Sequence, residues 1–296
     1  MKLLILGADG MLGMGIRQAL QETQVDVTLS ARRETTFTYG DHESFLTSPL
    51  GPGSFSDETD LSSYDFVINC IGAIKPRIDE SSSKSVQAAI EINSTFPHRL
   101  SDVAKKSGTR VIQIATDCVY SGDSGGYSEK SDHDPKDVYG KTKSLGEVQE
   151  GNFLNLRTSI IGAELNRVSS LFEWFRNQEQ GASLKGFANH MWNGVSTFHF
   201  GKVVSGIISQ QEFIAGTRHL IPSNMISKYE LLELFKRKLG RDDLNIEMFD
   251  APTIIDRTLN SDSPAINASL WAQAGYSGPP SIEKIVQEMP ATVFGS

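Results

Sequence analysis

The run MKLLILGADGMLG at residues 1–13 decides the fold, because an apolar stretch passes directly into three glycines, Gly7, Gly10 and Gly13. Residues 3–6 are too few for a buried helix and predict a strand buried on both faces, as in a parallel sheet. Glycine permits a tight turn at 7, close approach of backbone to a phosphate at 10, and close helix packing at 13.

A helix is expected to follow the turn over residues 11–22, with its N-terminal amides directed at the ligand. Unsatisfied N–H groups and the helix dipole favour an anion at that end. Three spaced glycines can also be a structural turn, but a strand before and a helix after them favour a dinucleotide site.

Length and charge limit the class of protein. The chain has 296 residues and a net charge of −8, which argues against a general binder of nucleic acid or of a membrane surface. No apolar stretch approaches the ~20 residues of a membrane span. With two cysteines, Cys70 and Cys118, a reducing compartment without disulfides is expected, and the predicted location is the cytoplasm.

Strand-like runs alternate with helical patterns through the first 160 residues, which predicts an α/β fold with a doubly wound parallel sheet of the Rossmann type. Residues 33–63 are rich in Ser, Thr, Gly and Pro and predict a short strand or an irregular loop. A long helix is expected over 83–107, divided by Pro97 near 95–96. The predicted strands are 2–6, 25–29, 65–71, 110–115 and 153–158.

After residue 161 the alternation weakens, and helices are predicted at 169–180, 198–210 and 227–239 with short strands between them. We therefore expect a dinucleotide-binding domain over 1–160. Residues 161–296 are expected to form mainly a smaller α+β substrate lobe, which could return strands or helices to the first domain.

The segment VYGKTKSLGE at 138–147 places Tyr139 and Lys143 four residues apart, on one face of a predicted helix. A phenol has an ordinary pKa near 10 and is a weak acid or base at neutral pH, so a nearby ammonium could bring it into range. A Tyr and a Lys on a solvated helix face would show the same spacing. The spacing of these two residues therefore leaves that alternative open.

A third segment, RVIQIATDCVYSG at 110–122, predicts a strand whose carboxyl end carries Thr116 and Asp117. In a parallel sheet this end faces the ligand crevice, where the Thr116 hydroxyl could hydrogen-bond a substrate carbonyl oxygen. The alternative is a Thr and Asp pair that caps a turn.

Together these segments resemble the extended short-chain dehydrogenase/reductase family, which combines a GxxGxxG turn with a Thr or Ser and a YxxxK pair. The similarity is greatest to its branch of dTDP-4-dehydrorhamnose reductases and relatives, and it extends to LRTSIIG at 156–162 and DRTLNSD at 256–262. Members of that branch act on nucleotide-linked 4-keto-6-deoxy sugars. The resemblance therefore implies an NAD(P)H-dependent reductase of a nucleoside-diphosphate sugar in deoxysugar or surface polysaccharide biosynthesis.

By motif position, the resemblance assigns three catalytic roles. Tyr139 donates a proton to the sugar carbonyl oxygen, Lys143 holds the nicotinamide ribose and lowers the pKa of the tyrosine, and Thr116 orients the carbonyl. Hydride transfer belongs to the cofactor, and the protein supplies geometry and electrostatics.

Cofactor preference follows from VTLSARRE at 27–34, where no acidic residue stands at the end of the strand to bond a ribose 2′-hydroxyl. Arg32 and Arg33 there favour NADPH, with NADH possible, although a pair of solvated arginines would look the same. The small residues of NCIGA at 69–73 resemble the family's cofactor-flanking turn. The residues assigned to cofactor binding are Gly7, Gly10, Met11, Leu12, Gly13, Ser30, Arg32, Arg33, Cys70, Ile71, Gly72 and Lys143.

Candidate substrate residues are Asp117, Cys118, His190 and Trp192. A related bifunctional epimerase and reductase, GDP-fucose synthase, carries a cysteine at a similar strand end, and His190 could be its proton-shuttling partner here. A lone cysteine is more often a small buried hydrophobe, and Trp192 could equally be a core residue.

Two other functions stay open. One is a bifunctional epimerase and reductase; a dehydratase is disfavoured because Cys118 follows Asp117 where an acidic pair would be expected. The other is a non-catalytic NADP-binding regulatory subunit, since the methionine adenosyltransferase β subunit resembles these reductases. No metal site is predicted, and neither nucleic acid nor membrane is an expected partner; a homodimer is possible.

Overall fold

The computed structural model describes residues 1–21, 23–32, 41–165 and 168–293. Within them a parallel sheet of seven strands has the order β11-β6-β5-β4-β1-β2-β3, which confirms the doubly wound α/β fold. The strand order reverses between β1 and β4, so a crevice opens there at the carboxyl ends of the strands. The strands are β1 (Lys2–Leu6), β2 (Asp26–Ser30), β3 (Glu43–Phe45), β4 (Phe66–Asn69), β5 (Arg110–Thr116), β6 (Phe153–Thr158) and β11 (Gly216–His219).

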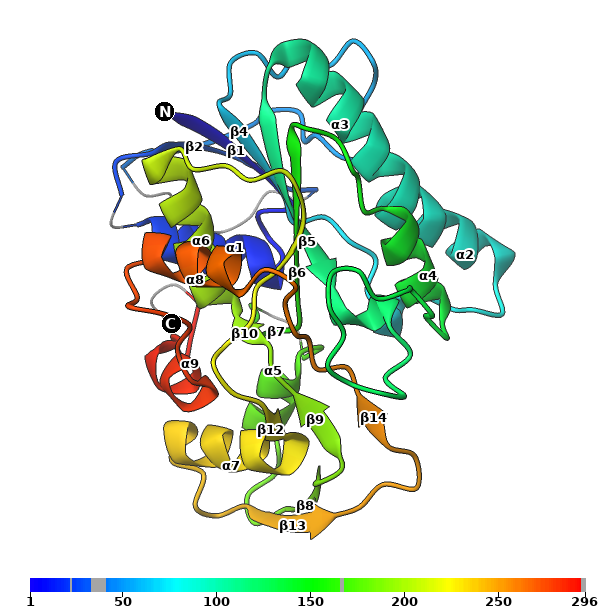
Figure 1. Cartoon of the computed structure of the whole chain (residues 1–296), viewed down its shortest axis with the longest axis vertical. Coiled ribbons are helices and arrows are strands. Elements are labelled where there is room, and N and C mark those ends of the chain that lie inside the picture. Colours follow the sequence, from blue (N-terminus) through cyan, green and yellow to red (C-terminus); the bar gives the residue numbers. More distant parts are fainter. Residues whose placement is uncertain (22, 33–40, 166–167, 294–296) are drawn as a thin grey trace.

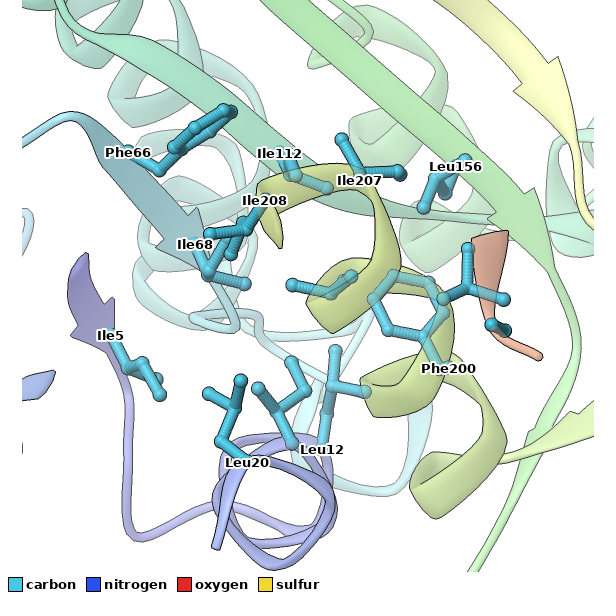
Figure 2. Close-up of a cluster of buried hydrophobic side chains, with 14 of the residues drawn as sticks. Ile5, Leu12, Leu20, Phe66, Ile68, Ile112, Leu156, Phe200, Ile207 and Ile208 are labelled. Atoms are coloured by element: carbon cyan, nitrogen blue, oxygen red, sulfur yellow. The ribbon is translucent and has the colours of Figure 1, made fainter. Parts of the chain in front are cut away.

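Helices cover both faces of this sheet (Figure 1). One face packs against α1 (Met11–Leu20), α6 (Thr197–Gln210) and α8 (Pro264–Gln273). Figure 2 shows Leu12 and Leu20 of α1 and Phe200 of α6 directed toward the strands, where all three side chains are buried. This cluster fixes the position of α1 and therefore of the turn before it.

The other face carries the long helix predicted over 83–107. It consists of α2 (Ser83–Ile90), a π-helical turn at Glu91–Thr95 and α3 (Phe96–Ser107), so the predicted division near 95–96 is confirmed. Pro97 has no N–H to donate, and α3 accordingly begins at this point. The buried Asn93 lies in the π-helical turn and hydrogen-bonds the backbone N–H and C=O of Ala73 and the hydroxyl of Thr142.

Beyond residue 160 part of the chain returns to the sheet as α6, β11 and α8, and the rest forms a smaller region at the bottom of Figure 1. This region contains two small sheets, with strand orders β12-β9-β14 and β13-β8. Its elements are α5 (Leu171–Arg176), β8 (Ser183–Phe187), β9 (His190–Trp192), β12 (Ile226–Ser227), α7 (Lys228–Leu239), β13 (Asn245–Phe249) and β14 (Ile255–Asp256). The remaining elements are α4 (Val138–Leu145), the paired strands β7 (Ile160–Ile161) and β10 (Val195–Ser196), α9 (Ile282–Glu288), and 3-10 turns at Lys75–Arg77 and Asp117–Val119.

Helix α5 is shorter than the predicted helix 169–180. Ser170 caps its start by accepting a hydrogen bond from the Glu173 N–H, and the Asn177 side chain bonds the Glu173 carbonyl at its end. The chain then turns at Gly181, whose φ of +77° suits glycine, before it enters β8. The apolar pattern did not show where the helix ends because capping depends on these local hydrogen bonds.

In the described residues, no helix combines the length and apolar character needed to cross a membrane.

Candidate active site

The glycine turn has the geometry that its spacing predicts. Gly7 has φ +75°, and its N–H donates to the Ser30 carbonyl at the end of β2, 2.9 Å away. A Cβ on Gly13 would lie 2.5 Å from the Gly7 carbonyl oxygen and 2.7 Å from the Ala8 Cα, so only glycine lets α1 pack this closely. No side chain caps the N-terminus of α1, and its first turn holds no acidic residue. The amides there are suited to a phosphate.

Two cavities meet at this turn. One, of about 500 Å³, extends toward Ser30, Arg32 and the loop 49–54. The other, of about 310 Å³, extends toward β5 and α4. They share Gly10, Cys70, Ile71, Gly72 and Arg77, and together could accommodate the two halves of a dinucleotide.

The predicted catalytic residues all line the smaller cavity, together with Met11 and Leu12. Thr116 ends β5, while Tyr139 and Lys143 come from α4, which begins after Asp137 accepts a hydrogen bond from the Gly140 N–H. Lys143 is buried, and its Nζ donates to the Ile114 carbonyl at 2.9 Å. The tyrosine and the lysine therefore face the crevice, and the alternative of a solvated helix face is excluded.

Burial is the main influence on the protonation of Tyr139 and Lys143. Burial raises the pKa of Tyr139, and the nearby Cys118 acts in the same direction, whereas a hydrogen bond with Thr116 opposes it. Burial therefore acts against the lowering of this pKa that the resemblance implied. Burial also lowers the pKa of Lys143 to about 8, with Glu147 opposing. At neutral pH the phenol is protonated and suited to act as an acid.

Asp117 and Cys118 line the same cavity. Burial raises the pKa of the Asp117 carboxyl, while the charges of Arg257 and Lys228 act against that rise. Burial also raises the pKa of the Cys118 thiol to about 12, so the thiol is neutral. A neutral thiol is a poor proton acceptor.

The structure does not bring the other two candidate substrate residues to this cavity. His190 lines a separate cavity, and its Nε2 lies 2.9 Å from the Thr253 carbonyl oxygen. Trp192 is buried, and its Nε1 donates to the Ser159 hydroxyl at 2.9 Å. Cys118 and His190 therefore do not face one another across one cavity, as an epimerase pair would.

At the cavity of about 500 Å³, Ser30 is buried, and its hydroxyl bonds both the N–H and the C=O of Leu50. This contact joins the end of β2 to the loop 49–54. Arg32 is exposed and lines the larger cavity. Arg33 lies outside the described residues.

Sequence reasoning did not single out Arg77, Lys228 or Arg257 individually. Arg77 lines both cavities and lies in the 3-10 turn Lys75–Arg77, which follows β4. Arg257 lies in the quoted DRTLNSD segment and donates from Nε to the Tyr120 carbonyl. Lys228 begins α7, more than a hundred residues from Asp117 in sequence, and no local pattern connects the two.

Comparisons with known proteins agree with this architecture. A dTDP-4-dehydrorhamnose reductase from Streptomyces griseus is 30% identical over 146 residues, 49% of this chain and 43% of that protein. The chain spans about half the length of the curated relatives that it matches at 28 to 31% identity.

Solved structures show the same fold over nearly the whole chain. A dTDP-4-dehydrorhamnose reductase ortholog from Clostridium acetobutylicum has a TM-score of 0.71 at 22% identity, covering 98% of both chains. The dTDP-4-dehydrorhamnose reductase of Bacillus anthracis in complex with NADP has a TM-score of 0.69 at 17% identity, covering 97% of this chain and 98% of that one.

The family model described as the RmlD substrate binding domain matches residues 1–291, nearly the full length. With the sheet order and the two cavities, this match establishes that the chain belongs to the RmlD substrate binding domain family.

Proposed function

We propose that the protein is an NADPH-dependent reductase of a nucleoside-diphosphate 4-keto-6-deoxy sugar, which serves deoxysugar or surface polysaccharide biosynthesis. The observation that carries the proposal is that Thr116, Tyr139 and Lys143 line one cavity, which adjoins the glycine turn. The curated relatives named dTDP-4-dehydrorhamnose reductase support the same class of substrate.

The chain's own residues fit a dinucleotide. The amides at the start of α1 would hold the diphosphate, Lys143 the nicotinamide ribose, and Ser30 and Arg32 the adenosine side. Bound there, NADPH would supply hydride. NADP is present in the related B. anthracis structure. NADH remains an alternative cofactor.

In this reading Tyr139 gives its hydroxyl proton to the sugar carbonyl oxygen. The Thr116 hydroxyl hydrogen-bonds that oxygen and orients it between the proton donor and the cofactor side of the cavity. Lys143 keeps a positive charge near the reacting groups at neutral pH, which stabilises negative charge that develops on the oxygen. Ile71, Ile114 and Ile160 give this cavity apolar walls, which would limit the access of water once both substrates are bound.

The test is a panel of nucleotide-linked 4-keto-6-deoxy sugars with the isolated protein, with NADPH consumption as the readout. We expect the protein to reduce at least one sugar of the panel, in a reaction that requires both the sugar and NADPH. If no member is reduced, and the protein instead co-purifies stably with an unrelated synthetase, the regulatory-subunit alternative replaces the proposal. The cytoplasmic location and the homodimer stay predictions from the sequence.

A further inference from the structure

Three buried side-chain amides lie side by side across the middle of the large sheet. Asn69 on β4, Gln113 on β5 and Asn155 on β6 are paired in register, and each is at most 2% exposed. Strands buried on both faces are normally apolar at such positions. An amide there costs free energy unless its polar atoms find hydrogen-bond partners, so the partners of these three show what the amides hold together.

The amides form one chain of hydrogen bonds with a defined direction. The Ile71 N–H donates to Asn69 Oδ1 at 3.1 Å, and Asn69 Nδ2 donates to Gln113 Oε1 at 2.7 Å. Gln113 Nε2 then donates to the Gly146 carbonyl at 2.9 Å and to Asn155 Oδ1 at 3.3 Å. Because a backbone N–H only donates and a carbonyl only accepts, Ile71 and Gly146 fix the orientation of the amides between them.

Both ends of this chain belong to the candidate active site. Ile71 lines both cavities. Gly146 is the C-cap residue of α4, and its N–H donates to the Lys143 carbonyl at 3.2 Å. The Lys143 Nζ in turn donates to the carbonyl of Ile114, the residue that follows Gln113. The end of α4 is therefore attached to β5 at two consecutive residues, once through a side chain and once through the backbone.

We propose that Gln113 is a positioning residue, whose amide fixes α4 relative to the turn at Ile71. Tyr139 and Lys143 are thereby held in register with Thr116, which ends β5. The inference rests on the proposed function, because the groups held in place are those assigned there to catalysis and to the cofactor. Gln113 is not among the residues that line either cavity, so it acts through the groups that it holds.

The experiment compares the wild type with Gln113→Met, which keeps the length of the side chain and cannot make its three hydrogen bonds. NADPH affinity, measured by fluorescence titration, should weaken by about 3-fold to 10-fold, because Ile71 and Lys143 both lose a support. With a 4-keto sugar that the wild type reduces, kcat should fall by about 10-fold to 100-fold, since a small misplacement of the proton donor is costly. The KM for the sugar should stay near the wild-type value.

Thr109→Val is the matched control for loss of a buried hydrogen bond. The Thr109 hydroxyl is buried and donates to the Leu61 carbonyl at 2.9 Å, just before β5 and at the opposite end of that strand from Thr116. This variant should have a lower thermal midpoint but the NADPH affinity and kcat of the wild type. All measurements are made well below the thermal midpoint of every variant.

Gln113→Glu tests the hydrogen bonds themselves. A protonated glutamic acid can accept from Asn69 and donate to Gly146, as the amide does, and burial favours this neutral form. An ionised carboxylate cannot donate to Gly146. NADPH affinity relative to the wild type should therefore be almost unchanged at about pH 6 and fall towards that of Gln113→Met at about pH 9. If Gln113→Met is too unstable to purify, this comparison alone decides the inference.

The inference is overturned if Gln113→Met binds NADPH as tightly as Thr109→Val does. It is also overturned if the affinity of Gln113→Glu, relative to the wild type, is no higher at the lower pH than at the higher one. Failure of the proposed function looks different: the wild type would reduce no 4-keto sugar, while the NADPH affinities of the variants would still follow the expected order.

Discussion

At the scale of single residues, the surroundings of Tyr139 determine its protonation state. Burial and the neighbouring Cys118 raise its pKa, while Thr116 acts against that rise. The phenol is therefore held as a neutral acid, the form that a carbonyl reduction needs. Its proposed role is separable from cofactor binding, because the glycine turn that we propose for the phosphates comes from other elements.

Replacing Tyr139 with phenylalanine should lower kcat by about 10²-fold to 10⁴-fold, because the proton donor is lost. NADPH affinity should stay near the wild-type value, as measured by fluorescence titration. Tyr64→Phe is the matched control, since Tyr64 lies outside both cavities of the site. Turnover by Tyr139→Phe at the parent rate would remove the tyrosine from the mechanism.

The pKa of Lys143 makes a prediction about pH. Because burial lowers this pKa to about 8, the ammonium is charged below that pH and loses its proton above it. We expect kcat/KM to be level near neutrality and to fall as the pH rises past about 8. Tyr139 cannot produce that fall, because its pKa is raised.

A pH profile of wild type and Lys143→Arg checks this, since a guanidinium keeps its charge through the alkaline range. The descending limb should move to higher pH in the variant. A wild-type profile that stays flat through the alkaline range would contradict the assignment.

Cofactor choice is a second question at this scale. Arg32 lines the cavity that we propose for the adenosine side, and no carboxylate ends β2. NADPH should bind more tightly than NADH, and Arg32→Ala should narrow the difference by weakening NADPH alone. Titration of NADPH and NADH into the wild type and into Arg32→Ala measures this preference. Equal affinities for the two cofactors in both proteins would refute it.

At the scale of elements, the unit β1, turn and α1 depends on close backbone contact. In Gly13→Ala the new Cβ would meet backbone of Gly7 and Ala8, which cannot move aside easily. We expect a loss of about 1–3 kcal/mol in the free energy of unfolding. NADPH binding should weaken as well, because α1 would shift.

Gly151→Ala is the control, since nothing lies within 4 Å of a Cβ at that position. Chemical denaturation and cofactor titration of both variants measure the two effects. Should Gly13→Ala unfold and bind like Gly151→Ala, the close approach of α1 to the turn would have no energetic importance.

The same unit shows why part of the fold was predictable. An apolar run followed by spaced glycines specifies β1 and the turn through local geometry, and both were predicted correctly. The π-helical turn at Glu91–Thr95 was not, because Asn93 is held there by Ala73 and Thr142, which are distant in sequence. The end of α5 was missed because local hydrogen bonds set it.

At the scale of the whole molecule, the seven-stranded sheet positions the glycine turn and Thr116, and residues 158–160, 164 and 169 complete the lining of the Tyr139 cavity. The placement of Lys228 near Asp117 depends on how the chain folds back after β12, which no motif encodes. The division into domains at residue 160 stays a prediction. Because α6 and β11 return to the large sheet, the sequence beyond residue 160 contributes to that sheet as well as to the smaller region.

The most direct test of the central claim follows the hydride itself. The protein is incubated with a dTDP-linked 4-keto-6-deoxy sugar and NADPH carrying deuterium at the transferable position, and the product is analysed by NMR. The account predicts deuterium on carbon 4 of the sugar with the wild type and almost none with Tyr139→Phe. Absence of deuterium from that carbon in the wild-type product, with every nucleotide-linked 4-keto sugar of the panel, would contradict it.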